Sequence, residues 1–148
     1  IVLSIIQIII LTSLSGNSLS FFNRYPMKLF ANQILSDPQS NKHIGLYQLG
    51  NNRARMGVLT GLPAIYLNNP KELKLFIKSN EIVYIVMRQT EWKENFHNLP
   101  LRAQAVDSGW KESRINKAEI QSFLISGLAS QLEKYSESYI LLKKTDTK

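Results

Sequence analysis

The chain opens with an uncharged, mainly apolar stretch over residues 1–23. Its first segment, IVLSIIQIIIL, has only Ser4 and Gln7 as polar residues, too few for the solvent-facing side of an amphipathic helix. Because about 20 apolar residues span a bilayer core of roughly 30 Å, the pattern predicts a transmembrane helix over 1–23. A signal-like segment and a buried core helix are the alternatives. A signal-like segment lacks support, because no basic residue precedes the apolar run and no small-residue cleavage site follows it. Because the chain lacks an initiating methionine, we expect that an upstream part is missing.

Residues 24–148 have the length of one domain and alternate between helical and extended patterns. Pro26 suits the first turn of a helix, and the polar cluster SDPQSNK ends that helix. The run HIGLYQLG then predicts a buried strand from its content of Ile, Leu and Tyr. The apolar residues of the first helix recur at helical spacing on one face: Met27, Phe30, Ala31, Ile34 and Leu35.

The middle of the chain has the clearest periodicity and predicts a βαβ unit. A strand over 64–67 is followed by a helix that begins at Asn69 and Pro70, and by a continuous apolar strand over 82–87. After it, EWKENFHNLP indicates a short helix or irregular segment, and RAQAVDSGWKESRIN has no strong periodicity. An amphipathic helix over 120–132 and a closing strand, SYILLKK, complete the pattern. We predict an α/β domain with a mostly parallel sheet of four or five strands flanked by helices.

Composition narrows the function classes. The chain has 18 Lys and Arg against 11 Asp and Glu, a formal net charge of +7, which suits anionic lipid headgroups, lipid-linked phosphates or nucleic acid. The basic residues are dispersed along the chain rather than clustered on one element with aromatic side chains, so we expect no nucleic-acid partner. The absence of cysteine excludes a disulfide framework and a thiolate metal site.

The densest group of polar and glycine residues is the segment YQLGNNRARMGVLTG, over 47–61. It follows a predicted strand, where glycine backbone amides can approach a phosphate and basic side chains can add charge. Its spacing matches neither standard phosphate-binding fingerprint, so a glycine-rich turn with exposed arginines is the competing interpretation. The candidate phosphate-binding residues are Asn51, Asn52, Arg53 and Arg55.

Other residue types nominate no catalytic or metal site. The two histidines, His43 and His97, lie in different segments and have no partner at helical spacing, so a zinc site is not expected. The acidic residues are scattered without an adjacent pair, and no G-x-S-x-G motif is present. We therefore assign no catalytic residue, no metal ligand and no cofactor to this chain.

The order of segments YPMKLFANQIL, HIGLYQLGNNRARMGVLTG, PKELKLFIK, IVYIVMRQTEW and SYILLKK resembles the carboxyl-terminal region of bacterial family 39 membrane glycosyltransferases, a group that includes protein O-mannosyltransferase-like and aminoarabinose-transferase-like enzymes. The resemblance covers most of the chain and implies that 1–23 is the last membrane helix and 24–148 a periplasmic domain capping the active-site cavity. It implies a bacterial inner-membrane location. Such enzymes transfer a sugar from a polyprenyl-phosphate carrier to an acceptor.

The resemblance also implies where catalysis occurs and what the chain contacts. The acidic catalytic residue of such enzymes lies in an early extracytoplasmic loop, outside this chain, and works with a divalent metal in some members. The expected partners are lipid-linked sugar, membrane lipid and the remaining transmembrane helices of the same protein. The alternative function is a single-helix anchored, non-catalytic α/β module that binds an anionic ligand or partner. A soluble nucleotide-binding domain is a third hypothesis, which the failed glycine spacing weakens.

Overall fold

The structure, a computed structural model, describes residues 26–110 and 136–145. Nearly all of these belong to one compact unit, formed by residues 25–108 and 138–148. The predicted membrane helix over 1–23 and the predicted helix over 120–132 lie outside the described residues, and the domain boundary after residue 23 remains a prediction. Within the described part of the chain, no helix is both long and apolar enough to cross a membrane.

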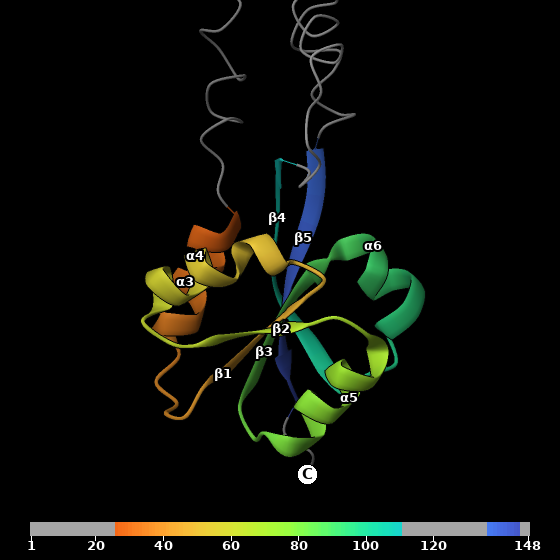
Figure 1. Cartoon of the computed structure of the whole chain (residues 1–148), viewed down its shortest axis with the longest axis horizontal. Helices are drawn as coiled ribbons and strands as arrows, with labels where there is room; N and C mark the ends of the chain where they lie inside the picture. The colour runs from red at the N-terminus through yellow and green to blue at the C-terminus, as the bar shows by residue number, and fades with distance from the viewer. Residues whose placement is uncertain (1–25, 111–135, 146–148) are drawn as a thin grey trace, which may run out of the picture. The chain divides into compact units, whose positions relative to one another are not determined.

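The described elements alternate between helices and strands along most of the chain (Figure 1). They are α3 (Pro26–Ser36), β1 (His43–Tyr47), the 3-10 helix η1 (Gly50–Asn52), α4 (Arg53–Thr60), β2 (Ala64–Leu67), α5 (Pro70–Ser79), β3 (Val83–Arg88), α6 (Gln89–Glu91), the π-helical turn η2 (Trp92–Phe96), β4 (Leu101–Trp110) and β5 (Ser136–Lys144).

Five strands form one mixed sheet in the order β2-β1-β3-β5-β4. The strands β2, β1 and β3 are parallel, whereas β5 is antiparallel to β3 with Tyr84 opposite Lys143. The hydroxyls of Ser108 and Ser138 lie 3.0 Å apart, and the backbone nitrogen of Thr145 donates to the carbonyl of Pro100 at 3.0 Å. Residue numbers therefore rise along β4 as they fall along β5, so this pair is antiparallel as well. The prediction of a mostly parallel sheet is wrong.

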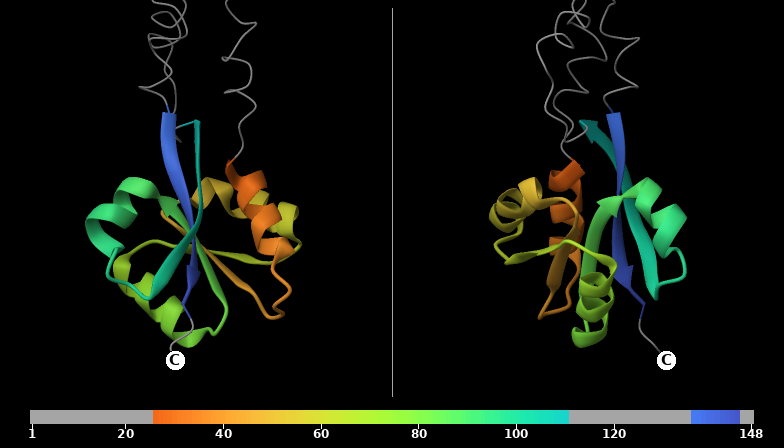
Figure 2. Two further views of the ribbon diagram at one scale, coloured as in Figure 1. Left: turned by 180° about the vertical axis from the view of Figure 1, so that it is seen from behind. Right: turned by 45° about the vertical axis from the view of Figure 1, so that its right-hand side comes forward.

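Helices cover both faces of the sheet (Figure 2). One face packs against α3 and α4, and the other against α5 and η2. Strand residues alternate between the two core clusters, as the pleat requires: Ile85 and Leu142 lie in the cluster with α5, and Val86 and Leu141 in the cluster with α3. The prediction that the central strand is buried on both faces is confirmed, because all residues from Val83 to Met87 are buried.

Several local predictions are confirmed and others are wrong. The helix starting at Pro26, the helix starting after Asn69 and the strand over 64–67 are present. The strand predicted for HIGLYQLG is present but ends earlier, at Tyr47. Leu35, predicted on the buried face of the first helix, is 49% exposed because the buried stripe ends at Ile34. In the glycine-rich segment, for which a turn was the competing interpretation, the structure has η1 and α4, and α4 ends at Gly61 with a left-handed φ of 68°. Residues 102–110, the described part of the segment without periodicity, lie in β4.

Candidate functional site

The carboxyl ends of the parallel strands β1 and β2 form the edge of the sheet from which η1, α4 and α5 depart. The connection after β1 runs to the face with α3, and the connection after β2 runs to the face with α5. Open α/β sheets bind ligands beyond the carboxyl ends of their strands, where neighbouring connections leave toward opposite faces. This carboxyl edge is therefore the candidate functional site.

The four residues nominated from the sequence lie at this edge, in η1 and in the first turn of α4. Asn51, Arg53 and Arg55 are exposed, whereas Asn52 is only 5% exposed. The Arg55 Nη1 atom lies 3.4 Å from Asn52 Oδ1, and Arg53 Nε donates to the backbone carbonyl of Ala64 at 3.1 Å. The structure brings Asn52 and Arg55 together, whereas the Arg53 guanidinium bonds to the start of β2, toward the amino ends of the parallel strands.

Sequence reasoning missed polar residues at the same edge: Gln48, which follows β1, Tyr66, which lies within β2, and Asn68, which follows β2. Gln48, with a positive φ of 54°, donates through Nε2 to the Asn68 carbonyl at 3.4 Å, and its backbone nitrogen bonds to Leu67. The Tyr66 hydroxyl lies 3.3 Å from Asn68 Oδ1, and the Tyr66 ring lies against Gly50. Because Gln48 and Asn68 directly follow predicted parallel strands, their place at one edge could have been inferred from the strand pattern.

Glu72 lies close to this edge, but its hydrogen bonds stabilise the start of α5. Its carboxylate accepts from the Asn68 backbone nitrogen and from Asn69 Nδ2, both at 2.7 Å. In return, Asn69 Oδ1 accepts from the Glu72 backbone nitrogen at 3.0 Å. Asn69 therefore caps the backbone nitrogen of the third helical residue, while the Glu72 carboxylate holds the Asn69 side chain and the backbone nitrogen of the residue before the cap. Glu72 therefore has a structural role and is not a free general base.

Tyr47 lies beneath the edge, at the end of β1. Its side chain is buried, and its ring meets Phe96 of η2 edge-on, with centroids 5.0 Å apart. Burial, reinforced by the negative charge of Glu91, raises the pKa of the Tyr47 hydroxyl. The hydroxyl accepts from Gln48 Nε2 at 3.4 Å and so helps to orient Gln48.

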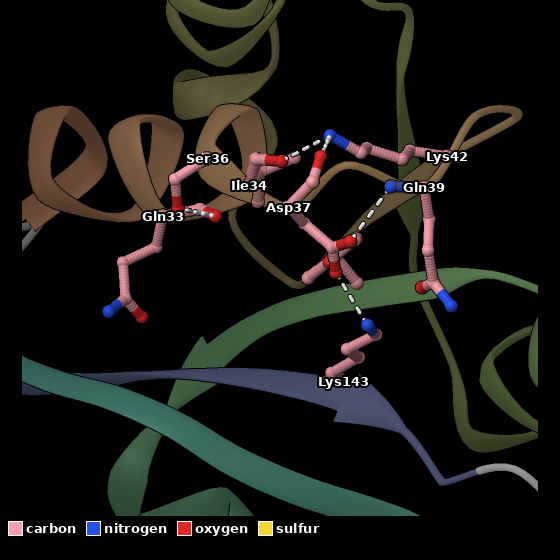
Figure 3. Close-up of polar contacts among 8 residues, drawn as sticks. Gln33, Ile34, Ser36, Asp37, Gln39, Lys42 and Lys143 are labelled. Atoms are coloured by element: carbon pink, nitrogen blue, oxygen red, sulfur yellow. Dashed lines mark hydrogen bonds and ion pairs between the residues drawn. The ribbon is translucent and has the colours of Figure 1, made fainter.

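A second polar cluster lies at the opposite edge of the sheet, on the face with α3 (Figure 3). Asp37 follows α3, and its Oδ2 atom accepts from Lys143 Nζ at 2.5 Å and from the Tyr84 hydroxyl. Its Oδ1 atom accepts from the Gln39 backbone nitrogen at 3.0 Å. Lys42 Nζ donates to the carbonyls of Ile34 and Asp37 at 2.6 and 2.5 Å, and so satisfies the end of the helix.

The electrostatics of this second cluster suit a structural role. The hydrogen bonds from Lys143 and Tyr84 hold the pKa of Asp37 well below its usual range, so the carboxylate is a weak base at neutral pH. Burial and the bond to Asp37 raise the pKa of Tyr84 far above 10. Efficient general acids and bases have pKa values near the working pH, which neither group has. The cluster therefore joins α3 to β3 and β5 rather than transferring protons.

The remaining sequence expectations concern metals. His43 starts β1, and its backbone nitrogen bonds to the Ile82 carbonyl, whereas His97 is exposed after η2. Between residues 26 and 110 and between 136 and 145, no three His, Asp or Glu side chains are grouped closely enough to hold a metal ion.

No family model, curated protein or solved structure matches the chain.

Proposed function

We propose that the chain is the carboxyl-terminal part of a membrane glycosyltransferase that moves a sugar from a polyprenyl-phosphate carrier to an acceptor. In this proposal the α/β unit is a non-catalytic, periplasmic domain that caps the active-site cavity in the bacterial inner membrane. Catalysis, with any divalent metal, belongs to loops outside this chain. The remaining transmembrane helices of the same protein and the lipid-linked sugar are its partners.

One observation carries the proposal beyond the order of sequence segments. The segment with Asn51, Arg53 and Arg55 directly follows a parallel strand, at the edge where open α/β sheets bind ligands. Both arginines are exposed residues, so their side chains can contact an anionic group on a carrier or an acceptor. Arginine suits this task because its planar group can form two parallel hydrogen bonds to a phosphate.

The first test uses the full-length protein with both arginines replaced. Arg53→Ala with Arg55→Ala should raise the apparent KM for the phosphate-bearing substrate about tenfold and leave kcat nearly unchanged, because a binding contact rather than a transition-state contact is lost. Arg53→Lys with Arg55→Lys keeps the charge and should recover part of the loss. Lys93→Ala with Arg102→Ala removes the same charge from exposed positions elsewhere and should have no effect.

Unchanged KM values in the double alanine variant would remove the arginines from the substrate site. Sugar transfer by the 148-residue chain alone would contradict the assignment of catalysis to missing loops. The upstream coding sequence separates the two main hypotheses. Several further membrane spans upstream of Ile1 would fit the transferase, whereas a start codon just before Ile1 would contradict it. In that case the arginines would serve a single-helix anchored module that binds an anionic ligand.

The proposed orientation has a direct test because the chain contains no cysteine. Val58 is 85% exposed on α4, so Val58→Cys introduces one accessible thiol into the chain without disturbing the core. A membrane-impermeant maleimide should label this thiol in cells with a permeabilised outer membrane. Labelling only after the inner membrane is broken would place the domain in the cytoplasm.

A further inference from the structure

We propose that a lysine-lined hollow between α5 and β5 binds a phosphate ester of a small apolar group. The hollow has a volume of about 350 Å³, near the lower end of the range of roughly 300–1,000 Å³ typical of small-molecule sites. It lies at the opposite edge of the sheet from the arginines, because α5 runs back from the carboxyl end of β2 to the start of β3. Its lining residues are Lys74, Ile77, Lys78, Leu99, Pro100 and Lys144.

The charge of this hollow is not balanced by the protein. Lys74 and Lys78 are exposed on successive turns of α5, and neither forms an ion pair within the described part of the chain. Lys144 Nζ donates to the neutral backbone carbonyl of Asn80 at 2.6 Å, which leaves two of its hydrogens for a ligand. No acidic side chain is among the described residues that line the hollow.

The two faces of β5 differ in whether their lysine has an acidic partner. Side chains alternate along a strand, so Lys143 points to the face with α3 and Lys144 to the face with α5. Lys143 is neutralised by Asp37, whereas Lys144 joins two further lysines without an acidic partner. The charge of Lys143 is therefore balanced on its face of the sheet, whereas the hollow near Lys144 favours an anion.

The rest of the lining is apolar and held in place by backbone hydrogen bonds. Ile77 is only 4% exposed, and Leu99 and Pro100 come from the connection between η2 and β4. The Leu99 nitrogen donates to Phe96 at 2.9 Å, and the Thr145 nitrogen donates to Pro100 at 3.0 Å. A fixed apolar wall beside three ammonium groups suits a ligand with an apolar body and a phosphate, for which lysine is a common partner.

The test is an NMR titration of the whole 148-residue chain with 1-naphthyl phosphate. We expect saturable shifts of the Ile77, Lys78 and Leu99 amides, weaker effects from inorganic phosphate and none from 1-naphthol. Lys74→Ala with Lys78→Ala should weaken binding about tenfold, or about 1.4 kcal/mol, because two exposed charge contacts are lost. Lys71→Ala with Lys93→Ala removes the same charge away from the hollow and should bind like the unmodified chain.

Equal weakening in both double variants, or shifts spread over all lysine-bearing surfaces, would overturn the site and leave only a general attraction to a basic protein. Absence of shifts in the unmodified chain would overturn it as well. Lys74→Glu with Lys78→Glu should abolish binding while the circular dichroism spectrum stays unchanged, because both positions are exposed on the helix. Decyl phosphate, used below its micelle concentration, shows whether the phosphate ester comes from a lipid or from a soluble molecule. Tighter binding than 1-naphthyl phosphate assigns the site to lipid phosphates, and weaker binding assigns it to soluble esters.

Discussion

Replacing Asp37 with Ala should destabilise the α/β unit by about 2–3 kcal/mol. The change removes the acceptor of three hydrogen bonds, from Lys143, Tyr84 and the Gln39 backbone. It also removes the connection between the end of α3 and the strands β3 and β5. Asp37→Asn keeps the size of the side chain but removes its charge, and we expect it to cost about half as much.

The magnitude follows from the burial of the partners. A hydrogen bond to a charged group contributes about 1.5–3 kcal/mol, and an unsatisfied buried hydroxyl costs about 1–3 kcal/mol. The side chains of Lys143 and Asp37 are 24% and 14% exposed, so water partly screens their attraction and replaces part of the loss. Tyr84 is 2% exposed, but the adjoining hollow of about 290 Å³ can admit a water to its hydroxyl. Both corrections favour the lower end of the summed range.

The assay is urea unfolding followed by circular dichroism, with hydrogen exchange of the β3 amides as a local measurement. Asp37→Ala, Lys143→Ala and the double variant form a cycle whose coupling energy should be about 1–2 kcal/mol. Glu81→Ala, at an exposed position, is the control and should change stability by less than about 0.5 kcal/mol. Additive effects of the two substitutions, with no coupling, would refute the reasoning that this ion pair joins the layers.

The same cluster predicts a pH dependence of stability with a definite sign. The folded-state pKa of Asp37 is lowered, so its contribution is present above the unfolded pKa of about 3.9 and is lost as pH falls through the folded value. The pKa of Tyr84 is raised, so its contribution is present below about 10 and is lost at higher pH. In a plot of the free energy of unfolding against pH, Asp37→Asn should flatten the acidic limb and Tyr84→Phe should flatten the alkaline limb. If neither variant changes its limb, the assignment is contradicted.

Two further substitutions test the packing and the start of α5. Gly45→Ala should cost about 1–3 kcal/mol in urea unfolding, because the added Cβ would lie 2.7–2.9 Å from three side-chain ends in the core, those of Leu67, Phe76 and Ile85; an unchanged midpoint would show that these side chains move freely. Asn69→Ala should cost about 1 kcal/mol by removing the cap, whereas Asn69→Ser should keep most of it, and equal stabilities of the two variants would contradict the capping role.

Local sequence patterns determined the elements whose signals are complete within a few residues. The helix α5 begins with an asparagine cap, a proline and a glutamate, and its apolar residues recur at helical spacing. The strand β3 is a continuous apolar run buried on both faces. These elements were predicted because neighbouring residues alone supply the cap, the periodicity and the apolar face.

Elements with weak local signals were missed. The helix α4 contains Gly57 and buries only Met56 and Thr60, so its periodicity is faint. The strand β4 lies at the edge of the sheet, and most of its residues are partly exposed, so it lacks the alternation of a half-buried strand. The strand β4 forms because β5 supplies its hydrogen-bond partners. The hydrogen bonds of α4 are internal, and this helix forms because α3 and β2 pack against it.

The sequence by itself determined that this chain forms helices and strands in an α/β order and that its basic residues outnumber its acidic ones. The tertiary structure alone decided the antiparallel direction of β5, the pairing of Asp37 with Lys143 and the grouping of Lys74 and Lys78 with Lys144. Asp37 and Lys143 are 106 residues apart in the chain. Contacts over such separations depend on the order and direction of the strands, which local patterns do not encode.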